Sequence, residues 1–469
     1  MTGPRALGTA LGSIVGAGNV LSGLQATAAF SSDATGTWRG SARCVVLPAT
    51  ADELAAVITE LVSRDVAYVV QGGNTGLVAG ATPLGGEVVV STRRLSGVDS
   101  LDAPRREMRV RAGTSLAQVQ RVAAAAGLEL AVDLAARDAA TIGGLVATDA
   151  AGSRSLRHGR MGAQLLEVDV VLPEGVLVRG LEVPPRAATR ATGAGRGRHE
   201  HLARLVAGSE GTLGTVTSAR VRLVPRLGAR ATALVAVARV ADAVELAARA
   251  RRALPSLDAM ELVESDAVEL VAEAAASHPP LAGTALVLLE CAAAVSPRRE
   301  LASFLEGADE VRGVLVATDA TARAQLWSWR RDVPAALASV GGHALDVGVP
   351  LARVPELLAR VRAALAALAP GSRLVAFGRL GVGALHLHVV GAAAGHTAVD
   401  AAIARAVVEL GGDVAGEHGV GRAKAALLER GGGEAPREPA GELKAVLDPR
   451  NLANPGVPAM RGGAGQRRW

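Results

Sequence analysis

Residues 71–77 read Gln71-Gly72-Gly73-Asn74-Thr75-Gly76-Leu77 and lie between two short apolar runs, 67–70 and 88–90. This alternation predicts two strands joined by a glycine-rich turn. Because glycine has no Cβ, the backbone N–H groups of such a turn can approach an anion and surround its oxygens. The turn is neither a Walker loop nor a GxGxxG fingerprint that opens a helix. Tight turns without a ligand use the same residues, so this turn alone does not identify a binding site.

Two further glycine-rich turns lie in the first half of the chain. The second reads Thr141-Ile142-Gly143-Gly144 and continues through Thr148 and Asp149 to Gly152. The third reads Gly208-Ser209-Glu210-Gly211-Thr212-Leu213-Gly214 and continues to Val216. We expect a strand on each side of the third turn, a strand over 167–172 and a helix over 115–126. The first half is therefore predicted to alternate strands and helices around glycine-rich turns.

Composition limits the classes of protein that the chain can represent. Its 469 residues exceed one ordinary domain, and 49% are hydrophobic, which is enough for a large core. The net charge of +5 is modest, the arginines are dispersed, and only 2% of residues are aromatic. Few rings are available to stack on bases, so no nucleic-acid partner is expected. Cys44 and Cys291 match no metal-binding spacing and are expected to be buried free thiols in a reducing cytoplasm.

The N-terminal segment admits two interpretations. Arg5, the mildly apolar stretch 6–24 and the small residues 26–28 imitate a secretory signal. Several glycines interrupt that stretch, however, and one helical face carries Leu7, Leu11, Ile14 and Val15. We therefore favour an amphipathic first helix and a cytoplasmic protein, and no apolar stretch is long enough to predict a membrane span.

The pattern changes after Pro225. Strands at 232–237 and 284–290 alternate with alanine-rich helices at 242–253 and 354–367, which predicts a second domain of α+β type. In the first half, we expect Asp52 to cap a helix that carries Leu54, Val57, Ile58 and Leu61. Residues 184–197, rich in Arg and Gly, are expected to form a surface excursion.

In this order, the three turns resemble the FAD-binding half of the vanillyl-alcohol oxidase/p-cresol methylhydroxylase superfamily, and in particular its D-lactate, glycolate and D-2-hydroxyglutarate dehydrogenase branch. Segments 36–40 and 451–456 resemble the opening and the ending of that branch. The resemblance implies an α+β fold, in which a PCMH-type FAD-binding domain of two α/β subdomains precedes a C-terminal FAD-linked oxidase domain with a ferredoxin-like antiparallel sheet and helices. The implied division is 1–40 for the N-terminal helix and opening segment, 41–225 for FAD binding, 226–457 for substrate, and 458–469 for a flexible tail.

The resemblance also implies a cofactor site. The first turn would hold the FAD pyrophosphate, and the other two would line the flavin and its ribityl chain. No histidine stands in the first turn, where some relatives attach flavin covalently, so FAD is expected to be non-covalent. The family usually has Asn at Leu145 and Asp149, and Gly at Ala151. The implied cofactor-binding positions are Gly72, Gly73, Asn74, Thr75, Gly76, Leu77, Leu134, Thr141, Gly143, Gly144, Thr148, Asp149, Gly152, Gly211, Val216 and Asn454.

Two motifs in the second half resemble catalytic segments of the family. Trp327-Ser328-Trp329-Arg330 resembles its Trp-x-x-Arg, whose Arg grips a substrate carboxylate, a task that suits a guanidinium fork. Residues 415–421, with Lys424, resemble its Glu-His-Gly motif. The resemblance implies that His418 takes the hydroxyl proton as hydride leaves C2 for the flavin, and that Glu417 is a metal ligand.

The chain departs from the family between Gly378 and His386. The 2-hydroxyglutarate branch has His, Asp and Asn where this chain has Arg379, Val382 and Ala384, and its two histidines and later Glu bind a divalent metal. His386 and His388 share a face if this segment is a strand. With Glu417 they could form a rebuilt zinc site. Alternatively, the positive charge of Arg379 disfavours a cation, and Arg379 holds a carboxylate directly. Arg379 and His386 are further candidate catalytic residues.

The substrate pocket departs as well. Ala344 stands where the family has Lys, and Pro334 where it has Thr, so a distal carboxylate loses two partners. The sequence therefore indicates an FAD-linked D-2-hydroxy acid dehydrogenase or oxidase that passes electrons to a quinone, an electron-transfer flavoprotein or oxygen, with a homodimer as one expected form. The main alternative is an FAD-binding protein with a degraded catalytic site that serves as a regulatory subunit. A related enzyme for sugars or aromatic alcohols is the third interpretation.

Overall fold

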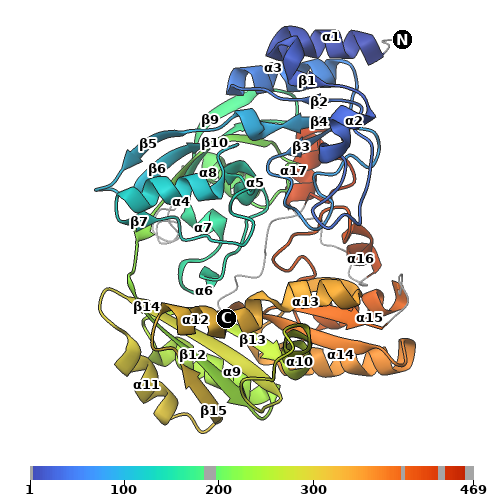
Figure 1. The fold of residues 1–469 in the computed structure, drawn as a ribbon. Coiled ribbons are helices and arrows are strands. Elements are labelled where there is room, and N and C mark those ends of the chain that lie inside the picture. The colour runs from blue at the N-terminus through green and yellow to red at the C-terminus, as the bar shows by residue number, and fades with distance from the viewer. Residues whose placement is uncertain (1–3, 184–196, 392–396, 431–438, 460–469) are drawn as a thin grey trace.

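The computed structural model describes residues 4–183, 197–391, 397–430 and 439–459 (Figure 1). Two bodies are apparent, an N-terminal one built on two sheets and a C-terminal one built on a single large sheet. The predicted surface excursion and the predicted tail lie almost entirely outside the described residues. None of the described helices combines the length and the apolar character needed to cross a membrane.

The first sheet of the N-terminal body has the order β1 (Val20–Leu21), β2 (Val45–Val46), β4 (Val88–Ser91), β3 (Tyr68–Gln71), with β2, β4 and β3 parallel. Helix α1 (Pro4–Val15) is the expected amphipathic helix, and it buries Leu7, Leu11 and Val15. It packs beside α3 (Ala51–Ser63), whose four predicted apolar residues are fully buried. The expected cap of α3 is wrong, because Thr50, rather than Asp52, accepts the N–H of Glu53 at 3.0 Å.

The second sheet of the N-terminal body is antiparallel. Its order is β5 (Val98–Asp102), β6 (Glu107–Arg111), β10 (Thr215–Arg222), β8 (Leu165–Val171), β9 (Leu177–Glu182). Helices α4 (Leu116–Ala125) and α5 (Ile142–Ala147) share its core. The strand expected before the third turn is wrong, because that segment is the helix α8 (Gly197–Val206). Leu202 and Val206 are four residues apart and pack on one core from a single helical face.

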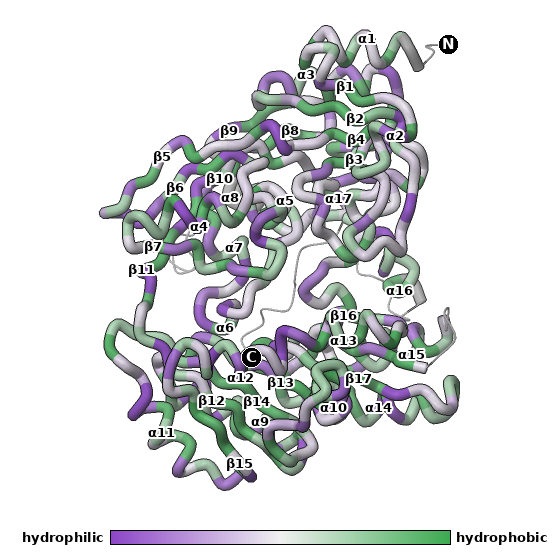
Figure 2. Tube along the Cα trace, viewed as in Figure 1, coloured by the Kyte–Doolittle hydropathy of each residue, from purple (hydrophilic) through white to green (hydrophobic). Residues whose placement is uncertain are grey.

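The C-terminal body confirms the predicted α+β pattern. Its antiparallel sheet has the order β15 (Val311–Val316), β12 (Ala229–Val237), β14 (Ala285–Ala293), β13 (Leu257–Glu264), β17 (Arg373–Arg379), β18 (Ala384–Val390), β16 (His343–Gly348). Its central strands are apolar and buried because helices cover both faces (Figure 2). One face packs on α9 (Val240–Ala253), α11 (Arg298–Glu306), α14 (Val354–Leu368) and α15 (Thr397–Glu409). The other face packs on α10 (Ser265–Ala274), α12 (Ala320–Arg331) and α13 (Val333–Val340).

Several short helices and strands complete the fold. The remaining helices and strands are α2 (Leu24–Thr27), α6 (Ser155–His158), α7 (Met161–Gln164), α16 (Ala425–Arg430), α17 (Pro439–Leu447), β7 (Leu128–Glu129) and β11 (Val224–Pro225). Cys44 and Cys291 are free thiols, as expected, and burial raises the pKa of each to about 11.

The end of the described chain returns to the N-terminal body, where α17 lies near β3 (Figure 1). Asn454 carries this contact. Its side chain accepts the N–H of Val70 at 2.8 Å and donates to the carbonyl of Glu210 at 2.6 Å, while only 2% of the residue is exposed. The C-terminal segment therefore joins β3 to the third glycine-rich turn.

We predict that Asn454→Ala lowers the free energy of unfolding by about 2–4 kcal/mol, because two buried backbone groups lose their partners. Asn451→Ala is the matched control. Asn451 also has a positive φ, +52° against +46° for Asn454, but its side chain is exposed. Both variants replace an asparagine, which tolerates a positive φ, with alanine, which does not. The difference between their free energies of unfolding, measured by chemical denaturation, therefore reports the hydrogen bonds of the buried Asn454 amide. Equal losses would contradict the role given to Asn454.

Candidate active site

The three glycine-rich turns of the N-terminal body pack against one another. A Cβ on Gly73 would lie 1.8 Å from the carbonyl oxygen of Ala139, so the first turn touches the segment that leads into the second. The N–H groups of Gly208 and Glu210 donate to the carbonyls of Val146 and Ala147 at 3.0 and 2.7 Å, which joins the third turn to the second. Segments far apart in the sequence thus form one surface of backbone.

The first turn has the donors that a pyrophosphate needs. Arg93 binds the carbonyls of Gly72 and Gly73 at 3.2 and 3.3 Å, so the N–H groups of the same two trans peptides point the other way. From Gly73 to Leu77, no backbone N–H donates to another described residue. Asn74 has a φ of +58°, and the nearby Thr141 Oγ1 is buried with no hydrogen-bond partner among the described residues. These unused donors fit the phosphates of FAD.

The other expected cofactor positions differ in what they contact. Gly143, Gly152 and Gly211 allow close packing, because a Cβ on each would lie within 3 Å of protein atoms. Asp149 has a φ of +45°, and its carboxylate accepts the N–H of Gly162 at 2.7 Å, a role that an amide oxygen could also fill. Thr148 donates to the carbonyl of Gly144 at 2.9 Å. Leu134, Leu145 and Val216 belong to or pack against the core of this subdomain.

In the C-terminal body, a row of polar side chains crosses four neighbouring strands. Glu261 lies on β13, Arg379 on β17, His386 on β18 and Asp346 on β16. The register places His386 directly opposite both Phe377 and Asp346. The rings of His386 and His388 both lie against Phe377, with centroids 4.8 and 5.6 Å from it, and therefore share one face.

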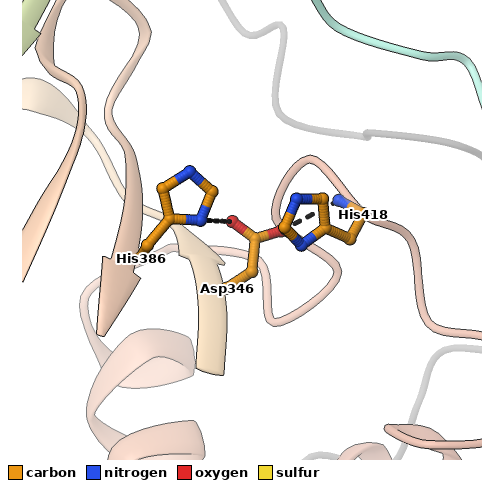
Figure 3. A group of neighbouring side chains, drawn as sticks. All are labelled: Asp346, His386 and His418. Carbon is orange, nitrogen blue, oxygen red and sulfur yellow. Dashed lines mark hydrogen bonds and ion pairs between the residues drawn. The ribbon is translucent and has the colours of Figure 1, made fainter. Parts of the chain in front are cut away.

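Asp346 positions the loop that carries His418. One carboxylate oxygen accepts the N–H groups of Glu417 and His418 at 2.6 and 2.9 Å. The other oxygen lies 3.3 Å from His386 Nδ1, and Figure 3 shows how Asp346, His386 and His418 lie together. The Nε2 atoms of His386 and His418 lie 3.2 and 3.4 Å from the same oxygen of Glu417. Sequence reasoning missed Asp346, although it lies two residues after Ala344, a position that was compared with the family.

Two arginines lie beside this cluster and share Glu261. Arg330 Nε donates to Glu261 at 2.8 Å, and its guanidinium stacks 4.6 Å over the ring of Phe377. Arg379 Nε lies 4.0 Å from the other oxygen of Glu261, and its Nη1 forms an ion pair with Glu417. Glu261, which sequence reasoning also missed, is 2% exposed and holds both arginines at the site.

The electrostatics follow from burial and these contacts. Burial alone would raise the pKa of Glu417, but Arg379, His386 and His418 hold it well below the usual range. Burial opposes protonation of His418, yet the carboxylates of Asp346 and Glu417 raise its pKa. For His388, burial and the neighbouring histidines lower the pKa to about 4.

The loop between α15 and α16 is also bound to the N-terminal body. Glu210, in the third glycine-rich turn, accepts the N–H groups of Val420 and Gly421 at 2.7 and 2.9 Å. The carbonyl of Val78 accepts the N–H of Arg422 at 3.0 Å, and Arg160 donates to the carbonyl of Gly416 at 2.8 Å. Sequence reasoning placed the third turn at the flavin but did not identify Glu210 as its link to the loop that carries His418.

The metal ligands expected from the sequence are not the group that the structure brings together. Among the described residues, Asp346, His386 and His418 have potential ligand atoms within 4.8 Å of one another. His388 lies outside this group and stacks on Phe377, and the carboxylate of Glu417 is paired with Arg379. The expected set of His386, His388 and Glu417 therefore differs from this group and stays a prediction.

Family models match both bodies that contribute to this site. Residues 42–180 match the FAD binding domain, and residues 227–457 match the C-terminal domain of FAD linked oxidases. The D-2-hydroxyglutarate dehydrogenase of Xanthomonas citri pv. viticola is 32% identical over 441 residues, which cover 91% of each chain. The D-lactate dehydrogenase of Archaeoglobus fulgidus is 28% identical over 416 residues, 88% of this chain and 90% of the relative.

Solved structures agree on the fold. p-Cresol methylhydroxylase with substrate bound has a TM-score of 0.72 at 13% identity, covering 97% of this chain and 96% of its own. The 4-ethylphenol oxidase of Gulosibacter chungangensis has a TM-score of 0.70 at 16% identity, with 97% of each chain covered. Given the extent of both domain matches and of the 32% identical relative, the chain belongs to the FAD-linked oxidase family and is a flavin-dependent oxidoreductase.

Proposed function

We propose that the protein oxidises a D-2-hydroxy acid to the 2-oxo acid, with His418 as the base. The observation that carries the proposal is the attachment of the His418 loop to Asp346 on one side and to the third glycine-rich turn, through Glu210, on the other. A base in this loop is held beside the turns that fit FAD. The names of the relatives, D-2-hydroxyglutarate and D-lactate dehydrogenase, support the class of substrate.

His418 is suited to remove the hydroxyl proton. The His418 side chain is 28% exposed, whereas that of His386 is 10% exposed, so substrate can reach it more readily. The carboxylates that raise its pKa also make the neutral imidazole a stronger proton acceptor. FAD, when bound, supplies the acceptor for the hydride that leaves C2. Electrons then pass to a quinone, an electron-transfer flavoprotein or oxygen.

Arg330 is proposed to bind the substrate carboxylate. Glu261 occupies its Nε, and no described residue accepts a hydrogen bond from Nη1 or Nη2. The fork therefore keeps a free edge that is oriented by Glu261 and by stacking on Phe377. Ala344 and Pro334 are exposed and uncharged and give no cation for a second carboxylate, which favours a hydroxy acid with one carboxylate.

A second candidate function is an FAD-binding protein without turnover. The observation that favours it is the ion pair of Arg379 with Glu417, which occupies the carboxylate that the resemblance assigns to a metal. The two candidates differ in one measurable result. The enzyme's flavin is reduced by its substrate and bleaches, whereas the flavin of a protein without turnover does not.

We expect the purified protein to show a flavin spectrum that bleaches on anaerobic addition of a D-2-hydroxy acid, and acid precipitation to release the flavin. The panel should contain D-lactate, D-2-hydroxyglutarate and longer monocarboxylic acids, with each L-enantiomer as the control. Bleaching by a D-acid supports the enzyme. A flavin that no acid bleaches would favour the second candidate, and protein that binds no flavin after reconstitution would contradict both.

His418→Asn is expected to lower kcat by about 10²- to 10⁴-fold while leaving the flavin content unchanged, because the base is lost and the turns remain. His343→Gln is the matched control, since that side chain is 47% exposed and pairs with Asp400 at 2.9 Å outside the cluster. Single-turnover flavin reduction measures the effect. Unchanged reduction in His418→Asn would exclude His418 as the base.

Arg330→Gln is expected to lower kcat/KM by at least about 30-fold, or about 2 kcal/mol, mainly through KM, because the substrate carboxylate loses a buried cation. Arg330→Lys should recover only part of this loss, since lysine lacks the fork. Arg331→Gln is the control, because Arg331 is the next residue and its side chain is 60% exposed. A KM that does not change in Arg330→Gln would instead indicate substrates without a carboxylate, such as a sugar or an aromatic alcohol.

A further inference from the structure

We infer that Arg379 replaces the divalent metal of the relatives' site, so that this active site holds a fixed organic cation and works without a metal. The guanidinium pairs with one oxygen of Glu417, while the other oxygen of that carboxylate faces His386 and His418. The side chains of Arg379 and Glu417 are 13% and 8% exposed, so the pair lies inside the protein. A cation therefore already sits on the carboxylate that the resemblance assigns to a metal.

The charges of the cluster support this inference. The connected ion pairs contain three carboxylates, Glu261, Asp346 and Glu417, and three fixed cations, Arg330, Arg379 and Lys424. Within these ion pairs, three negative and three positive charges cancel while both histidines are neutral, and the carboxylates of Glu210 and Asp413 act on Lys424 from outside them. A divalent ion would add two positive charges to ion pairs that already balance, which is unfavourable in a largely buried cluster.

The other potential ligands also fit a metal poorly. One oxygen of Asp346 already accepts two N–H groups and lies 3.8 Å from the ammonium of Lys424. Lys424 is fixed there, because it donates to the carbonyls of Asp346, Val414 and Ala415 at 2.7, 2.9 and 3.1 Å. A metal on Asp346, His386 and His418 would thus lie close to an ammonium and would occupy the proposed base.

A guanidinium can perform the electrostatic part of a metal's task. It stays charged at any physiological pH, donates hydrogen bonds and accepts none. Arg379 and the ring of His418 contact opposite oxygens of the same carboxylate, that of Glu417. The charge of Arg379 therefore favours an anionic oxygen in this part of the site. Unlike a metal, it is covalently part of the chain and cannot be removed by a chelator.

The test is metal content, which does not depend on turnover and therefore separates this inference from the proposed function. Holoprotein is incubated with ZnCl₂, dialysed, and measured for zinc and flavin per chain. We expect less than about one-tenth of a zinc per chain for the native protein, and about one for Arg379→His, which adds a third ligand beside His386 and Glu417 and removes the cation. Arg379→Lys retains the charge and should stay free of zinc.

The flavin spectrum and thermal unfolding establish that each variant is folded, and Arg379→His combined with His386→Gln should lose the acquired zinc. About one zinc per native chain that survives dialysis would overturn the inference. A folded Arg379→His that binds no zinc would also overturn it, because the arginine would then not be what keeps the ion out. Flavin reduction in the native protein is expected to be the same with and without EDTA, and inhibition by EDTA that zinc reverses would contradict the inference.

Discussion

The candidate active site depends on two carboxylates, one buried and one half-buried, that hold one loop from opposite sides. Asp346 in the C-terminal body accepts the N–H groups of Glu417 and His418, and Glu210 in the N-terminal body accepts those of Val420 and Gly421. Hydrogen bonds to an ionised acceptor are stronger than neutral ones, and a carboxylate left alone in the interior is costly. The loop therefore has one favourable position, which places His418 between the two bodies.

This arrangement also explains why the site requires both bodies. The third glycine-rich turn contributes to the surface that fits FAD, and the same turn carries Glu210. Burial raises the pKa of Glu210, and the N–H groups of Val420 and Gly421 and the charge of Lys424 offset part of that effect. If the bodies separated, Glu210 would lose both N–H donors and His418 would move away from the turns. The surface that fits FAD and the proposed base are thus coupled through one side chain.

Local sequence patterns predicted what is local in the structure. The glycine-rich turns, the N-terminal helix and the α+β character of the second half follow from residue spacing, and the family motifs singled out Arg330 and His418. Local patterns failed at the start of α3, where Thr50 and Asp52 are both suitable capping residues and Thr50 is the one that caps the helix. They also failed before the third turn, where an Arg- and Ala-containing segment forms α8 instead of a strand. Glu210, Asp346 and Glu261 could not be found in this way, because each bonds residues about 70 or more positions away.

The neutral charge of the cluster sets a condition on the substrate. Three carboxylates and three cations cancel, so a bound anion needs a compensating charge. The free edge of Arg330 can orient a substrate carboxylate, but the charge of Arg330 is already counted in the balance, so the net charge with substrate bound is still negative. In the proposed reaction, His418 takes the hydroxyl proton while the hydride that leaves C2 carries away the negative charge. A positive ring therefore remains beside Asp346 and Glu417, which already raise the pKa of that ring. A substrate carboxylate and a protonated His418 therefore stabilise each other, and a neutral alcohol would give up this contribution.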